Sequence, residues 1–247
     1  MDISWRLPPA RPTLEPQHIH LWQAVLEATP ERLLDYWALL APHERERAER
    51  FRFPQHRDRF VVGRGMLRSL LGSYLEIAPA QVQFEYSERG KPFLAAGIDL
   101  SFNVSHSRDR ILLGFAWNVR LGVDLEYVRP MPEAAQLATR FFCPAEAAIV
   151  AALPAVERER AFFCAWTRKE AYLKATGEGI LGLADVEVAI AADRSPEILA
   201  IGGDRANALA WSLHHLEPAT SYVGAVAWEH GPDIPAWALD YWQFIPT

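Results

Sequence analysis

The sequence predicts an α+β fold of two similar halves, each with a long helix packed on an antiparallel sheet. Apolar residues recur at helical spacing from 55 to 75, and alternating strand-like segments follow them. The same order, a strong helix and then strands, recurs from residue 156 onwards. The segments 112–117 and 223–228 are also alike, because each is an apolar run that ends in tryptophan. The expected halves are residues 1–120 and 121–247, with a binding site favoured at their junction.

The first half is expected to begin with an extended arm, because residues 1–18 contain four prolines. Thr29, Pro30 and Glu31 then give an N-cap, a first-turn proline and an acidic first turn, which together predict the start of a helix. The charge run from 43 to 50 alternates in sign, as is typical of a solvated helix. The other expected elements of this half are helices at 30–40 and 55–75, strands at 82–86, 100–104 and 111–117, and a polar turn at 105–109.

The second half is expected to open with a strand at 121–127. Its main helix, from 156 to 175, is expected to stop at Gly177 and Gly179, since glycine readily ends helices. The other expected elements are a helix at 144–153 and strands at 186–190, 208–216 and 222–228.

Composition excludes several classes of protein. The chain has 247 residues, 50% of them hydrophobic and 23% charged, which is typical of a soluble globular protein. A net charge of −6 disfavours nucleic acid and anionic membranes as partners. The N-terminus lacks a basic stretch before an apolar run, so a cytoplasmic protein is expected. Cys143 and Cys164 have no metal-binding spacing and are expected to be core residues.

Asp124 and Glu126 are the first candidates for chemistry. They stand two apart in a predicted strand, so both carboxylates leave the same face. One interpretation is a strand with one solvated face, where water screens the repulsion. The other is a divalent cation between them, and oxygen ligands without a neighbouring His or Cys indicate Mg²⁺.

A helical segment, 166–174, carries the second set of candidates. Trp166, Glu170 and Lys174 follow one another at steps of four and therefore lie on one face of the helix. Alone, Glu170 and Lys174 would be an ordinary surface ion pair. Lysine is otherwise scarce, because only Lys91, Lys169 and Lys174 stand among 25 basic residues. We expect retained lysines where a compact ammonium does what a guanidinium cannot, and we expect Lys169 to be the most tolerant, with a free head group.

Together these segments resemble the paired signature of the 4'-phosphopantetheinyl transferases, and the chain is similar to their larger, monomeric Sfp type. The resemblance extends from about residue 42 to residue 174. It rests on the segments 122–126 and 166–174, supported by 89–92, 102–107 and 140–142 leading to Glu146.

The resemblance implies transfer of the phosphopantetheine arm of coenzyme A to a serine of an apo acyl or peptidyl carrier protein, as in fatty acid, polyketide or nonribosomal peptide biosynthesis. Adenosine 3',5'-bisphosphate would be released. Asp124, Glu126 and Glu170 would hold Mg²⁺ on the diphosphate, and Glu170 is also the candidate general base. A metal-bound water is the alternative proton acceptor. Lys174 would meet phosphate oxygens and steady the leaving group.

The resemblance also implies the residues that bind coenzyme A. Gly90, Lys91 and Pro92 would line the adenine end, and Ser105 with His106 would meet the ribose 3'-phosphate or the diphosphate. The arginine-rich region matches the segment that relatives use against the 3'-phosphate, which carries over Arg47, Arg59 and Arg64. Glu44 departs from the pattern, because relatives often have lysine there.

Three alternatives remain at this point. A Mg²⁺-dependent coenzyme A phosphohydrolase would use the same ligands with water in place of the carrier serine. A non-catalytic protein that binds the carrier or coenzyme A would not need three metal-binding carboxylates. Nucleic-acid binding would use the eight arginines from 45 to 68, but acidic residues are interleaved with them. If a carrier is the partner, its docking surface is expected in the segment 127–142, which offers apolar side chains.

Overall fold

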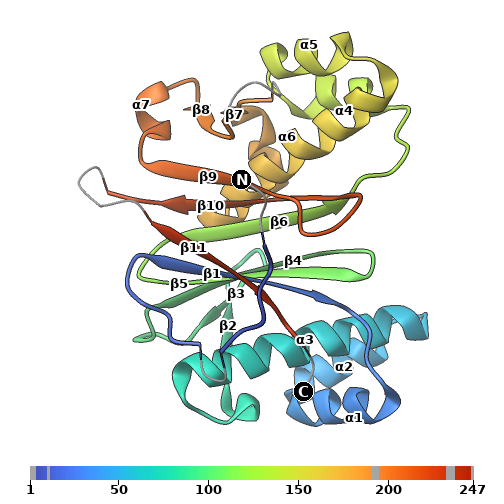
Figure 1. The fold of residues 1–247 in the computed structure, drawn as a ribbon, viewed down its shortest axis with the longest axis vertical. Helices are drawn as coiled ribbons and strands as arrows, with labels where there is room; N and C mark the ends of the chain where they lie inside the picture. The colour runs from blue at the N-terminus through green and yellow to red at the C-terminus, as the bar shows by residue number, and fades with distance from the viewer. Residues whose placement is uncertain (1–3, 10–11, 191–194, 232–236, 246–247) are drawn as a thin grey trace.

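The structure is a computed structural model that describes residues 4–9, 12–190, 195–231 and 237–245, and Figure 1 shows these in four layers, with helices outside and two sheets inside. The helices of one outer layer are α1 (Pro30–Leu39), α2 (Pro42–Glu49) and α3 (Pro54–Leu75). Those of the other are α4 (Ala134–Phe141), α5 (Pro144–Ala152) and α6 (Ala155–Thr176). Residues 1–3 and 10–11 of the expected arm lie outside the described residues.

The first sheet has the strand order β11-β1-β5-β4. Its strands are β1 (His18–Val25), β4 (Leu100–Ser107), β5 (Arg110–Trp117) and β11 (Ala238–Gln243). β1 pairs antiparallel with β5 and parallel with β11, so the end of the described chain returns to the N-terminal sheet.

The second sheet has the order β6-β10-β9, all antiparallel. Its strands are β6 (Leu121–Tyr127), β9 (Trp211–Leu216) and β10 (Tyr222–Glu229). In each sheet the first strand is followed by a long helix and then by a hairpin, whose last strand lies in the middle. The minor elements are η1 (Pro79–Gln81), β2 (Phe84–Tyr86), β3 (Pro92–Leu94), η2 (Ile180–Asp185), β7 (Val186–Val188), β8 (Ile198–Ile201) and α7 (Arg205–Ala208).

The predicted α+β class, with a long helix on each sheet, is confirmed. The hydroxyl of Thr29 caps α1 by accepting a hydrogen bond from the backbone N–H of Arg32. The two alike segments are β5 and β10, the middle strands of the repeated arrangement. The division of the chain at residue 120 stays a prediction.

Several details differ from the sequence prediction, and three of them concern the main sheets and helices. Each repeated unit begins with a strand, and β1 was not predicted because both its faces are buried, which removes the alternation. Helix α4 was also missed. The predicted turn at 105–109 is wrong at its start, because β4 continues to Ser107 and carries Ser105 and His106 as strand residues.

Three apolar cores hold the layers together. One lies between α1–α3 and the first sheet, one between the second sheet and α4–α6, and one between the two sheets. The middle core contains residues from both sheets, such as Leu21 and Leu112 of the first and Val123 and Val226 of the second. Among the described residues, no helix is long and apolar enough to cross a membrane.

Polar side chains of β4 join the edges of the two sheets. Asn103 Oδ1, Ser105 Oγ and Ser107 Oγ accept hydrogen bonds from successive outward N–H groups of β6 at 2.9, 3.2 and 3.1 Å. These bonds satisfy the edge of β6, whose N–H groups would otherwise be buried without partners. They also fix β4 beside the strand that carries Asp124 and Glu126.

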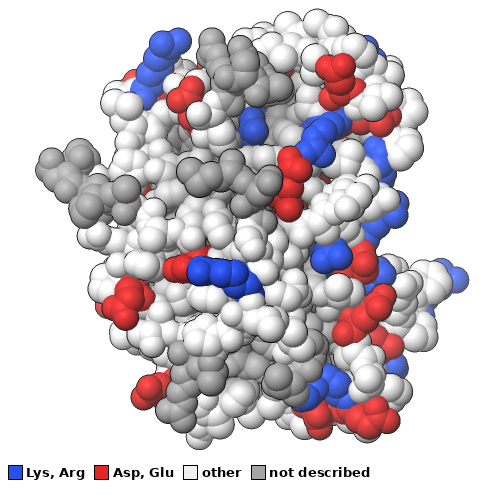
Figure 2. Space-filling model, in the orientation of Figure 1, with Lys and Arg blue, Asp and Glu red and all other residues white. Residues whose placement is uncertain are grey.

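Charged side chains on the face drawn in Figure 2 are interleaved in sign, with Lys and Arg close to Asp and Glu. Such an arrangement gives a mixed surface rather than a single basic patch on this face.

Candidate active site

A cavity of about 410 Å³ is lined by residues of α2, α3, β4 and α6 and by the turn between β2 and β3. It therefore collects side chains from both repeated units. The residues predicted from the sequence that line it are Arg47, Arg59, Arg64, Gly90, Lys91, Pro92, His106, Glu170 and Lys174. The others, Ser105, Asp124 and Glu126, are not part of this lining; Ser105 and Asp124 are hydrogen-bonded to Lys174, which is part of it.

Asp124 is the centre of a short hydrogen-bond network. Its Oδ1 accepts bonds from Lys174 Nζ at 2.6 Å and from Ser105 Oγ at 2.8 Å, and Lys174 Nζ also donates to Ser105 Oγ at 2.9 Å. Asp124 is buried, and its Oδ2 has no hydrogen-bond partner within the described residues. One carboxylate oxygen is thus used and the other is available.

The two other acidic candidates are half-buried. Glu126 accepts a hydrogen bond from Ser107 Oγ at 2.9 Å. Burial, with the Asp124 carboxylate adding to it, raises the pKa of Glu126 above its usual value. Burial also raises the pKa of Glu170, and the carboxylates of Asp124 and Glu126 act in the same direction. The carboxylates therefore repel one another in a place that water screens poorly.

The acidic group fits a divalent cation in its chemistry. Asp124 offers an unpartnered buried oxygen, and a cation would relieve the repulsion among Asp124, Glu126 and Glu170. In the described part of the chain, no three acidic, His or Cys side chains form a metal cage by themselves. Mg²⁺ commonly takes only one or two carboxylates and completes its shell with water and substrate phosphate.

Close packing of α6 on β6 brings the two predicted segments together. Gly122 makes this possible, because a Cβ there would overlap with the backbone of Ala171 and Ala175. The step of four places Glu170 and Lys174 on one face of α6. Gly122 therefore sets the distance from these two side chains to Asp124.

Another part of the cavity is basic. The guanidinium groups of Arg47 and Arg64 lie 5.2 and 5.8 Å from the ring of Phe60, and Arg59 lines the same cavity. Burial lowers the pKa of His106, and Lys174, Arg47 and Arg59 lower it further. Burial and the neighbouring cations therefore both disfavour the charged form of His106.

Comparison with known proteins agrees with this arrangement. Residues 120–227 match the model of the 4'-phosphopantetheinyl transferase superfamily, and residues 23–115 match that of the N-terminal part of 4'-phosphopantetheinyl transferases. The chain is 42% identical to the 4'-phosphopantetheinyl transferase HetI of Nostoc sp. over 230 residues, which cover 92% of this chain and 94% of HetI.

The chain belongs to the 4'-phosphopantetheinyl transferase superfamily. It is thus a transferase, as predicted. Two further relatives are a putative 4'-phosphopantetheinyl transferase of Synechocystis sp. (43% identity, covering 60% of this chain and 61% of the relative) and Sfp of Bacillus subtilis (27%, covering 59% and 63%).

The ammonium group of Lys91 in the transferase contacts the backbone of α6. Lys91 lines the cavity, but its Nζ donates to the backbone oxygens of Lys174 and, at 3.2 Å, of Ala175. Arg89 Nη1 likewise donates to Gly177 O at 3.1 Å. The turn between β2 and β3 thereby caps the carbonyl end of α6, where cations are favoured.

Lys169 was expected to be the most tolerant lysine, with a free head group, and the free head group is wrong. Its side chain is fully buried, and Nζ lies 2.5 Å from Glu146 Oε2 while also donating to backbone oxygens of Leu183 and Val186. The expectation arose because Lys169 lies next to the helix face that carries Glu170 and Lys174, and a position beside that face was taken to be exposed to solvent. In the transferase that side packs against α5 and η2 instead.

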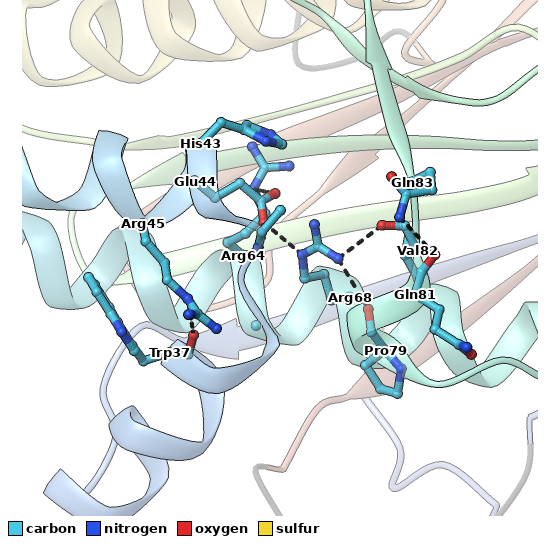
Figure 3. Close-up of polar contacts among 12 residues, drawn as sticks. Trp37, His43, Glu44, Arg45, Arg64, Arg68, Pro79, Gln81, Val82 and Gln83 are labelled. Carbon is cyan, nitrogen blue, oxygen red and sulfur yellow. Dashed lines mark hydrogen bonds and ion pairs between the residues drawn. The ribbon is translucent and has the colours of Figure 1, made fainter.

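The transferase's α2 was expected to be a solvated helix, yet Glu44 is buried. Figure 3 shows its carboxylate between Arg64 and Arg68 of α3. A run of alternating charges does not predict which charged side chain will be buried, because that depends on the helix against which the run packs.

Sequence reasoning gave no role to several residues that line the cavity. Asn103 and Arg89 stand inside the motifs that carry the resemblance, so their position was a usable signal. Phe60 and Tyr86 had no such signal, because aromatic residues at these spacings predict core packing.

Proposed function

We propose that this transferase moves the 4'-phosphopantetheine arm of coenzyme A to a serine hydroxyl of an apo acyl or peptidyl carrier protein and releases adenosine 3',5'-bisphosphate. The observation that carries the proposal is one cavity that combines two groups of side chains. Glu170 and Lys174 line it together with a separate group of arginines and His106, and Asp124 and Glu126 repel Glu170 from beside it. Carboxylates suit a diphosphate bridged by a cation, whereas arginines bind a phosphate directly. Coenzyme A carries both groups.

Asp124, Glu126 and Glu170 are the proposed ligands of Mg²⁺. When bound, Mg²⁺ would neutralise the negative charge of the diphosphate. The unpartnered Oδ2 of Asp124 supports this assignment, and Lys174 would hold its other oxygen in place.

The proposed reaction forms a bond between the serine oxygen and the phosphorus on the pantetheine side of the diphosphate, and breaks the bridging P–O bond. Glu170, which lines the cavity, accepts the hydroxyl proton. Lys174 donates to the phosphate oxygen that gains charge as the adenosine bisphosphate leaves. Ser105 keeps Lys174 and Asp124 in register by bonding to both.

The remaining assignments concern binding. Arg47, Arg59, Arg64 and His106 are proposed for the 3'-phosphate, and Gly90 with Pro92 and the stem of Lys91 for the adenine. All of these residues line one cavity. We propose that the protein acts as a monomer in the cytoplasm. The docking surface for the carrier is proposed in the segment 127–142.

The test is intact mass spectrometry of several apo carrier domains after incubation with the protein, coenzyme A and Mg²⁺. We expect a mass gain equal to the phosphopantetheine arm, which a chelator prevents. A carrier-free reaction is the control, because release of phosphopantetheine without carrier would indicate a phosphohydrolase. Binding of coenzyme A or carrier without any turnover would indicate a non-catalytic protein and would refute the proposal.

A further inference from the structure

Glu44 lies on α2 and faces two arginines of α3 (Figure 3). Its side chain is 1% exposed. Oε2 accepts hydrogen bonds from Arg68 Nε at 2.7 Å and from the backbone N–H of Ala41 at 2.9 Å, while Oε1 lies 3.3 Å from Arg64 Nε. Glu44 Oε1 has no hydrogen-bond partner among the described residues, so the carboxylate holds Arg68 by a hydrogen bond and Arg64 by an ion pair.

The two arginines are used differently. Arg68 is fully buried, and its Nη1 donates to Pro79 O at 3.2 Å and Val82 O at 3.0 Å, so its role is to join α3 to the loop before β2. Arg64 lines the cavity instead, and its Nη1 is buried without a hydrogen-bond partner among the described residues. Of the two arginines, Arg64 is therefore the one that lines the cavity and can meet a ligand there.

Aromatic rings complete the setting of Arg64. Its guanidinium lies 5.8 Å from the ring centre of Phe60 and 5.1 Å from that of Phe84. Arg47 lies over the same Phe60 ring at 5.2 Å, so the two cations stand beside one another at the cavity. One carboxylate between two guanidinium groups leaves a net positive charge, and a buried unpaired N–H is costly until an acceptor meets it.

We propose that Glu44 is a positioning residue, which holds Arg64 so that its guanidinium group, at the cavity, binds the 3'-phosphate of coenzyme A. The inference rests on the proposed function. The inference explains why position 44 carries a glutamate although relatives often have lysine there. In this protein the cation is Arg64 of α3, and the Glu44 carboxylate orients it. Arg side chains carry large rotamer entropy, which a fixed partner removes before the ligand binds.

The test compares the affinities of adenosine 3',5'-bisphosphate and adenosine 5'-monophosphate by calorimetry, without metal or carrier. The unchanged protein is expected to prefer the bisphosphate. Glu44→Gln should reduce this preference about tenfold, as loss of one well-oriented charge-assisted contact does. Arg68→Lys is the matched control, because it disturbs the same carboxylate from the side remote from the cavity. It should lower stability and leave the preference unchanged.

A second set of variants separates positioning from folding. Arg64→Met should reduce the preference at least as much as Glu44→Gln does, and adding Glu44→Gln to Arg64→Met should change it no further. If Glu44→Gln does not fold, Glu44→Asp, which moves the carboxylate back by one methylene, should show the same reduced preference.

An unchanged preference in the Glu44 variants, or an equal loss in Arg68→Lys, would overturn the inference. That result can occur while arm transfer to carriers is fully active, so failure of this inference is distinguishable from failure of the proposed function, in which no transfer is seen at all.

Discussion

Lys169 and Lys174 occupy the same helix, and their surroundings give them different roles. Lys174 lines the cavity and bonds to Asp124 and Ser105, with 29% of its side chain exposed. Lys169 is enclosed, paired with Glu146, and bonded to two backbone oxygens. Substitution by arginine keeps the charge of each and changes only its shape, so it separates reactivity from packing.

Lys174→Arg is expected to lower kcat at least about tenfold, or about 1.4 kcal/mol in the activation barrier. The ammonium fits between Asp124 Oδ1 and Ser105 Oγ and has a further donor for a phosphate oxygen. A planar guanidinium is too wide for this position and does not release a proton near neutral pH. Steady-state rates with one apo carrier measure the effect, and a rate within twofold of the unchanged protein would remove Lys174 from the catalytic group.

Lys169→Arg is expected to lower the free energy of unfolding by about 1–3 kcal/mol, because a wider group is forced into a filled and fully buried site. Denaturant titration measures this loss. Lys174→Arg is the control, since its partly exposed side chain can adjust. Equal stability of the two variants would show that the site around Lys169 can expand.

At the scale of elements, the approach of α6 to β6 decides the geometry of the site. Gly122→Ala should cost about 1–3 kcal/mol of stability, because its Cβ overlaps with backbone atoms of Ala171 and Ala175. It should also lower kcat, since Glu170 and Lys174 would move away from Asp124. Gly63→Ala is the control for stability: there the Cβ meets only side-chain methyls, at 3.2 and 3.3 Å. Equal effects on stability would contradict the account.

The junction of β1, β11 and α3 should make stability depend on pH. Burial lowers the pKa of His20 to about 4, against the attraction of Asp240 and with the repulsion of His18. The unfolded chain binds a proton near pH 6.5 and the folded chain does not. Stability is therefore full above pH 6.5 and falls by up to about 3 kcal/mol as the pH drops towards 4.

The measurement is the free energy of unfolding at pH 7 and pH 5. His20→Gln is the comparison, because it keeps a side-chain hydrogen bond available to Tyr74, which His20 contacts at 2.7 Å. This variant should show a weaker dependence on pH, with the remainder due to other buried histidines such as His215. The same slope in both proteins would exclude His20 as its source.

The sequence was sufficient to predict most of the main helices and many of the strands. Helix boundaries were close to those found because Thr29, Pro30 and Gly177 are strong local signals. β1 was not predictable in the same way, since a strand buried on both faces lacks alternation and its place depends on β5 and β11, far along the chain. His106 and Ser105 were taken for a turn because their polarity is explained only by the neighbouring β6, to which Ser105 bonds.

At the scale of the whole molecule, the cavity exists because two helix-on-sheet units meet. The carboxylates come from β6 and α6, and the arginines and His106 come from α2, α3 and β4. The sequence motifs were sufficient to name most of these residues. They were not sufficient to show that Glu44 turns inward or that Lys91 caps α6, because both depend on contacts between the units or between helices.

The central claim is that Asp124 belongs to the chemistry of arm transfer and not to the binding of the nucleotide or to the fold. Asp124→Ala tests it most directly, in one mass-spectrometric assay of an apo carrier with coenzyme A and Mg²⁺, alongside calorimetry with adenosine 3',5'-bisphosphate. We expect the variant to be folded and to bind the bisphosphate through the arginines, but to add no phosphopantetheine to a carrier that the unchanged protein converts completely. Full metal-dependent transfer by Asp124→Ala would contradict the account.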